Sequence, residues 1–102
     1  MAEFRDYLTF LEALREELEK LNGIEQRKIA AVRAGDLETL DACMKQEQAA
    51  SLSLRGQEQR REALLTELGM QGVSLRELAE HAPQTLRAET AQKVEALLQA
   101  KP

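Results

Sequence analysis

A few side chains in this sequence are of the types that carry out chemistry in proteins. Glu77 and His81 are four residues apart, so a helix would place them on one face, where a carboxylate and an imidazole can share a metal ion. A metal site in a helical bundle needs several such pairs on facing helices, and this chain has one histidine. We therefore expect no metal site, and we interpret His81 as an exposed residue that favours the end of a short helix.

Acid–base and nucleophilic catalysis are the other chemistries to weigh. Glu25 and Glu47 could form a pair of carboxylates, but we expect both to point toward water or toward arginines. Cys43 falls on the apolar side of a helical segment, which favours a small buried thiol over a nucleophile. The five glycines form no cluster of the kind that cradles phosphate. We predict a protein that is not an enzyme and binds no cofactor.

The composition is that of a helical protein. The 102 residues indicate one domain, 1–102, and charged residues make up 31 % of the chain against 3 % for aromatic ones. The net charge is −4, with Arg and Glu interleaved, whereas nucleic-acid binding calls for a basic face; we expect no nucleic-acid partner. No run is apolar enough for a membrane span or a secretory signal, and a single cysteine allows no internal disulfide. These features predict a cytoplasmic protein.

The first expected helix covers residues 3–34. Gly35 then supplies the left-handed residue that often ends a helix, and Asp36 supplies a favoured N-cap for the next one. Adjacent stop and start signals predict a tight antiparallel reversal at 34–36. The apolar stripe of this helix has steps of three and four residues and is narrower after Leu21; its members are Phe4, Tyr7, Leu8, Leu11, Leu14, Leu18, Leu21, Ile29 and Val32.

The second expected helix covers residues 37–68, with a stripe of Leu37, Leu40, Met44, Leu54, Leu64, Leu65 and Leu68, and with Cys43 on its flank. Reversal at Gly35 would set Ile29 opposite Cys43. The same alignment would set Glu25 opposite Glu47, which is unfavourable unless Lys28, Lys45 or an outside partner neutralises the pair.

Two shorter helices should follow. Ser74 and Glu77 form an S-x-x-E capping box, flanked by Val73 and Leu78 at the spacing of a hydrophobic staple, which predicts a helix over 75–82 that Pro83 ends. A last helix is expected over 84–100. The predicted fold is therefore all-α: a long, coiled-coil-like antiparallel hairpin, with the short third helix and the C-terminal helix packed at its open end. The apolar side of the last helix either completes the core or forms part of a groove for a partner helix.

Residues 11–69, "LEALREELEKLNGIEQRKIAAVRAGDLETLDACMKQEQAASLSLRGQEQRREALLTELG", resemble the FlgN family of flagellar type III export chaperones. The matching features are the "AGDLETL" turn, the central "KQEQ" at 45–48, the later "EQRREALL" and the following "GVSLRELAEHAP", and the likeness spans about residues 4–83. Members usually continue into a longer final helix than "LLQAKP" provides. Because of this shorter ending, the resemblance does not identify the client protein.

The resemblance implies a cytoplasmic chaperone that binds the C-terminal helical segments of hook-associated proteins, of the FlgK and FlgL type, and delivers them to the flagellar export apparatus. It implies partner contacts in the C-terminal region, which by position are Leu75, Leu78, Leu86, Val94, Leu97 and Leu98. The alternative function is a coiled-coil oligomerisation or adaptor module without chaperone activity, with a homodimer as one of its forms.

Overall fold

The computed structural model describes residues 3–100 and consists of helices; no strand occurs in that range. The expected all-α hairpin is confirmed. Residues 1, 2, 101 and 102 of the expected 1–102 domain lie outside the described part. The molecule is 52 Å long and 23 by 18 Å across. Its elements in order are α1 (Phe4–Ala34), α2 (Leu37–Glu67), the 3-10 turn η1 (Leu75–Glu77), α3 (Leu78–His81), the 3-10 turn η2 (Gln84–Leu86) and α4 (Arg87–Ala100).

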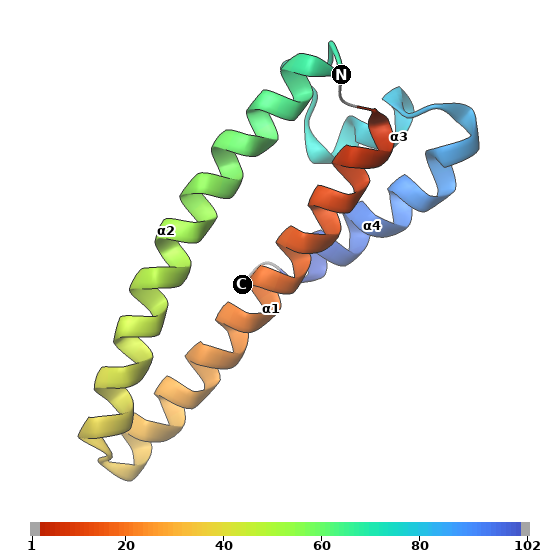
Figure 1. Ribbon diagram of the computed structural model, residues 1–102. Helices are drawn as coiled ribbons and strands as arrows, with labels where there is room; N and C mark the ends of the chain where they lie inside the picture. The colour runs from red at the N-terminus through yellow and green to blue at the C-terminus, as the bar shows by residue number, and fades with distance from the viewer. Residues whose placement is uncertain (1–2, 101–102) are drawn as a thin grey trace.

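The chain reverses at Gly35, where the sequence predicts it. Gly35 has a φ of 68°, and the next residue, Asp36, donates its backbone N–H to the carbonyl oxygen of Ala31 at 2.9 Å. The Asp36 carboxylate then accepts a hydrogen bond from the backbone N–H of Thr39 at 3.1 Å. One residue therefore closes α1 and the next one opens α2, so the two long helices lie antiparallel, as Figure 1 shows.

A second left-handed glycine, Gly69, ends α2 in the same way, and Ser74 opens the C-terminal part. The Ser74 hydroxyl oxygen accepts from the backbone N–H of Glu77 at 3.3 Å, as the capping box predicts. The expected helix over 75–82 is split into η1 and the single turn of α3. Pro83, with a φ of −53°, separates α3 from η2 and α4.

Helix α4 runs parallel to α1. Along α1, Arg5, Glu12 and Asn22 contact Glu89, Lys93 and Ala100 of α4 in the same order. Figure 1 shows α4 beside the first half of α1, with its end about midway along that helix. The bundle thus has α1, α2 and the shorter α4 at one end and only α1 and α2 toward the α1–α2 turn.

The core lies at the three-helix end. It draws on α1, the second half of α2, α3 and α4. Phe10 is 5 % exposed although it lies outside the stripe expected for the first helix, because α1 is covered by α2 on one side and by α4 on another. The buried core residues are Phe4, Tyr7, Leu8, Phe10, Leu11, Leu18, Leu64, Leu65, Leu78, Ala82, Val94, Leu97 and Ala100.

The two-helix end is packed differently from the prediction. Small residues, Ala31 and Cys43, are the buried ones there. Four larger side chains that the apolar pattern assigns to the seam are exposed instead, so that part of the prediction is wrong: Ile29, Val32, Leu37 and Met44. Small seam residues let the two helices approach closely, which leaves the larger neighbours on the sides of the pair. None of the helices described has the length and apolarity needed to cross a membrane.

Candidate functional site

Two polar contacts mark the two sides of the hairpin. The guanidinium of Arg27 donates to the side-chain oxygen of Gln46 at 2.7 Å on one side, and Lys28 Nζ donates to Glu47 at 2.9 Å on the other. Because residues three, four and seven apart share a helix face, the side of Lys28 and Glu47 also carries Leu21 and Val32 from α1 and Leu40 and Met44 from α2. Leu37 lies seven residues before Met44 and belongs there too.

We call this side the open face, defined by Leu21, Val32, Leu37, Leu40 and Met44, with Ile29 at its edge. Its exposure is unusual. Val32 is 61 % exposed, Leu37 76 % and Met44 50 %. The exposed large apolar residues of the described chain, with Leu52 the remaining one, all fall between residues 29 and 52. Exposed apolar side chains gathered on one side of the helix pair make this side a candidate interaction surface.

The open face leads into a groove at the three-helix end, which we call the leucine groove. Five leucines line it, with Glu58, Arg61, Ser74 and Arg76 at the rim, and its volume is about 650 Å³. Leu14 lies seven residues before Leu21, so groove and open face follow one side of α1. The five leucines are Leu14, Leu18, Leu54, Leu75 and Leu98.

Two ion pairs, Arg61 with Glu58 and Lys28 with Glu47, lie along this surface. Hydrogen bonds to Glu58, at 2.6 Å for the shortest, raise the pKa of Arg61, which therefore stays charged at the groove rim. Burial raises the pKa of Tyr7, and the neighbouring Arg61 opposes that shift only in part. Further along, the hydrogen bond to Glu47 raises the pKa of Lys28. The surface thus presents fixed charges between apolar side chains.

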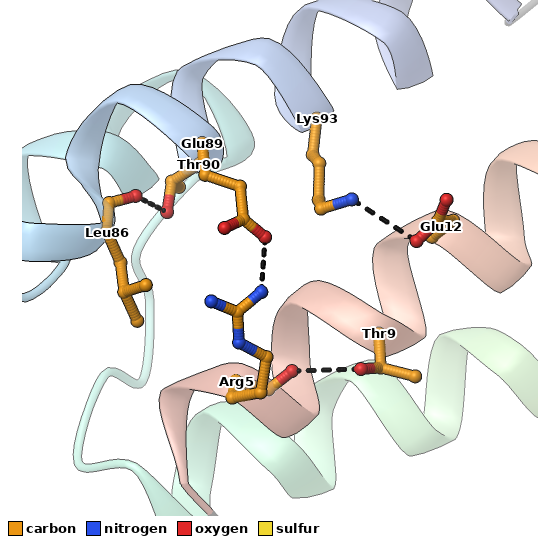
Figure 2. A network of polar contacts seen from close by, with 7 residues as sticks. All are labelled: Arg5, Thr9, Glu12, Leu86, Glu89, Thr90 and Lys93. Atoms are coloured by element: carbon orange, nitrogen blue, oxygen red, sulfur yellow. Dashed lines mark hydrogen bonds and ion pairs between the residues drawn. The ribbon is translucent and has the colours of Figure 1, made fainter.

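The wall that α4 contributes is held to α1 by polar contacts, shown in Figure 2. Arg5 pairs with Glu89, and Lys93 Nζ lies 3.2 Å from a carboxylate oxygen of Glu12. The contact with Arg5 lowers the pKa of Glu89. Thr90, which is fully buried, donates its hydroxyl hydrogen to the carbonyl oxygen of Leu86 at 2.6 Å and so needs no other partner. These contacts hold α4, which contributes Leu98 to the leucine groove, in place against α1.

No family model, curated protein or solved structure matches this chain.

The six residues that the resemblance implies for partner binding differ in how deeply they are buried. Leu78, Val94 and Leu97 are buried in the core, at 1 %, 7 % and 0 % exposure. Leu86 is partly buried and packs against that core. Leu75 and Leu98 are also partly buried, and they line the leucine groove.

The residues considered for chemistry are dispersed. Glu77 accepts a hydrogen bond from the Ser74 hydroxyl at 2.7 Å, and His81 is an exposed residue at the end of α3. Cys43 is buried, and Glu47 is paired with Lys28 rather than with Glu25. Within residues 3–100, no group of three or more His, Cys, Asp and Glu is arranged to hold a metal ion.

Sequence reasoning missed the open face as a surface, although it named all of its residues. The apolar stripes of the expected helices contain Leu21, Ile29, Val32, Leu37, Leu40 and Met44. The missing signal was the size of the residues beside them: Ala31 and Cys43 suit a close helix contact better than the larger side chains do. A stripe that also contains small residues can have its small members in the seam and its large members outside.

Proposed function

We propose that this protein binds an amphipathic helix of another protein along the open face and the leucine groove. The observation that carries the proposal is the exposure of Val32, Leu37 and Met44 on the same side of the hairpin as the groove. An amphipathic helix buries its own apolar stripe in such a surface. From Leu14 to Val32 the surface is about 27 Å long, which matches a helix of roughly 18 residues.

The client class that we propose follows from the resemblance to FlgN-type export chaperones: the C-terminal helical segments of hook-associated proteins. Such a segment is apolar on one face and tends to self-associate when free. Covering it together with the open face contributes about 25 cal/mol per Å² of apolar area before the costs of ordering. With those costs, we expect a Kd on the order of micromolar. Holding a client unassembled in the cytoplasm, and handing it to the export apparatus, is the proposed role.

The test is calorimetric titration of the full chain with a 20-residue peptide from the end of a hook-associated protein, beside a scrambled peptide that lacks helical periodicity. Val32→Asp and Met44→Asp place a charge on the open face and should each weaken binding at least about tenfold. Ala49→Asp is the matched control, since Ala49 is exposed and lines a hollow on the other side of the hairpin with Arg27 and Gln46.

Circular dichroism of all variants should remain that of the unsubstituted protein, because Val32, Met44 and Ala49 are exposed in it. Two results would contradict the proposal. One is the absence of heat and of any change in peptide helicity at several hundred micromolar. The other is an equal loss of affinity in Ala49→Asp.

The same exposed side chains favour a second candidate function, an oligomerisation module in which two copies join through their open faces. A two-fold axis through the middle of the face would bring the Glu25 carboxylates of the two copies together, which disfavours that arrangement. Light scattering from about 10 to 200 μM, which lies above the expected micromolar Kd, distinguishes the two functions. A tight dimer that the client peptide does not dissociate supports the module.

A further inference from the structure

Three charged side chains, Glu25, Lys28 and Glu47, lie in the middle of the open face, and their charges do not cancel. Lys28 Nζ donates to both carboxylate oxygens of Glu47, at 3.1 and 2.9 Å. Glu25, also partly buried, makes neither an ion pair nor a hydrogen bond with any residue from 3 to 100. The charge of Glu25 contributes to the raised pKa of Lys28, but less than Glu47 does. One negative charge is left over.

The surroundings of Glu25 make that charge important for binding. Glu25 follows Leu21 by four residues and precedes Val32 by seven, so all three share one side of α1. A wholly apolar helix laid on the face would take the Glu25 carboxylate out of water without giving it a partner. Such burial is strongly unfavourable. A helix with an acidic residue opposite Glu25 would add repulsion between the two carboxylates.

This inference rests on the proposed function: we infer that the bound helix carries a Lys or Arg opposite Glu25. On either side of that cation, the helix carries apolar residues at positions three to four and seven residues away. The leftover negative charge is the complement of that single cation. The complements of the apolar flanks are Leu21, which is partly buried, on one side of Glu25, and Val32, which is exposed, on the other. The pairing fixes the position of the helix along the face and rejects acid-centred helices.

The test uses three peptides of one apolar pattern that differ only at the central residue, which is Lys, Leu or Glu, titrated against the full chain. The Lys peptide should bind about five- to tenfold more tightly than the Leu peptide, and the Glu peptide should be the weakest. In the Glu25→Gln variant the Lys and Leu peptides should bind alike. In Glu25→Lys the order of the Lys and Glu peptides should reverse.

Glu16→Gln is the matched control. Glu16 is an exposed glutamate of the same helix, nine residues before Glu25 and hence on the opposite side, and its substitution should leave the order of the peptides unchanged. Salt at 0.5 M should reduce the Lys preference, since screening weakens a partly exposed pair (the Debye length falls to about 4 Å at that concentration).

The outcomes separate the inference from the proposed function. Three peptides that bind with Kd values within about twofold of one another would overturn the charge pairing and leave helix binding standing. A Lys preference that persists in Glu25→Gln would also overturn it, because another carboxylate would then be responsible. Failure of all three to bind would overturn both.

Discussion

Gly35 donates its backbone N–H to the carbonyl oxygen of Val32 at 3.2 Å and takes a φ of 68° in doing so. That conformation is open to glycine at no steric cost, whereas a side chain there costs about 1–2 kcal/mol. The reversal of the chain, and with it the pairing of α1 with α2, rests on this residue. Its neighbour Asp36 completes the turn by capping α2.

Gly35→Ala should therefore lower the free energy of unfolding by about 1–2 kcal/mol. Gly23→Ala is the matched change in the interior of α1, where the added Cβ meets nothing within 4 Å apart from its chain neighbours and the backbone of its own helix, and it should raise the free energy of unfolding by up to about 1 kcal/mol. Urea denaturation followed by circular dichroism measures both. If the two substitutions shifted stability in the same direction, our account of the turn would be wrong.

Leu97 tests whether the last helix is part of the core. Its side chain is fully buried between α1 and the C-terminal elements, so Leu97→Ala should cost about 2–5 kcal/mol. Leu52 is 67 % exposed on α2, and Leu52→Ala should change the stability by less than about 0.5 kcal/mol. The measurement is again the urea midpoint with its slope. Equal costs would mean that α4 is not docked as described.

Leu97 and Leu98 also show which features of the fold the sequence predicts and which it does not. The four helical segments follow from the left-handed glycine, the aspartate and serine caps and Pro83, because these are local signals that act on the nearest backbone groups. The sequence pattern marks both leucines as apolar. It does not show that Leu97 is buried and Leu98 lines a groove, because that depends on the parallel alignment of α4 with α1, which contacts distant in sequence determine.

At the two-helix end, too, the sequence does not show which apolar side chains are buried. Apolar periodicity predicted Ile29 opposite Cys43, whereas Cys43 is buried and Ile29 is 44 % exposed. The possibility that Lys28 would neutralise Glu47 was visible in the sequence, and the pair forms at 2.9 Å. Lys28, and not Glu25, faces Glu47, and Glu25 has the same charge as Glu47 and cannot pair with it. Which of the two α1 side chains faces Glu47 depends on the rotation of the helix about its axis, and apolar periodicity defines that rotation only coarsely.

Glu89 gives a prediction on pH. The hydrogen bond from Arg5 lowers the pKa of Glu89 below its ordinary value of 4.5, so the folded protein holds this carboxylate ionised more strongly than the unfolded chain does. The resulting stabilisation is fully present above pH 4.5 and is lost as the pH falls through the lowered pKa. Glu89→Gln should lower the Tm slightly at pH 7, and the difference from the unsubstituted protein should shrink below pH 4.5.

The measurement is a set of thermal melts between about pH 7 and pH 3, the range in which carboxylates titrate. Glu95→Gln is the matched control on α4, because Glu95 is exposed and forms no ion pair or hydrogen bond with residues 3–100. A Tm difference for Glu89→Gln that stays constant down to pH 3 would show that the ion pair with Arg5 does not contribute to stability.

Cys43 provides a probe of the two-helix end. Its thiol is 1 % exposed and lies in the seam below the open face, so a thiol reagent reaches it only when the seam opens. The seam there is made of small residues and bears no third helix, so it should open locally with less free energy than global unfolding requires. If only global unfolding exposed the thiol, the free energy of unfolding would set the labelling rate. We expect the native protein to be labelled at least about tenfold faster than that rate, which corresponds to a local opening with a free energy about 1.4 kcal/mol lower.

The comparison that gives this labelling its meaning is a thiol in the three-helix core. In Cys43→Ser combined with Leu65→Cys, the new thiol replaces a side chain that is 5 % exposed, and its labelling should require global unfolding of that variant. A client helix on the open face stabilises the closed seam beneath it, so saturating peptide should slow labelling of Cys43. A peptide bound only in the leucine groove would leave the rate at Cys43 nearly unchanged. Labelling rates with and without peptide therefore locate the client along the hairpin, which an affinity alone does not do.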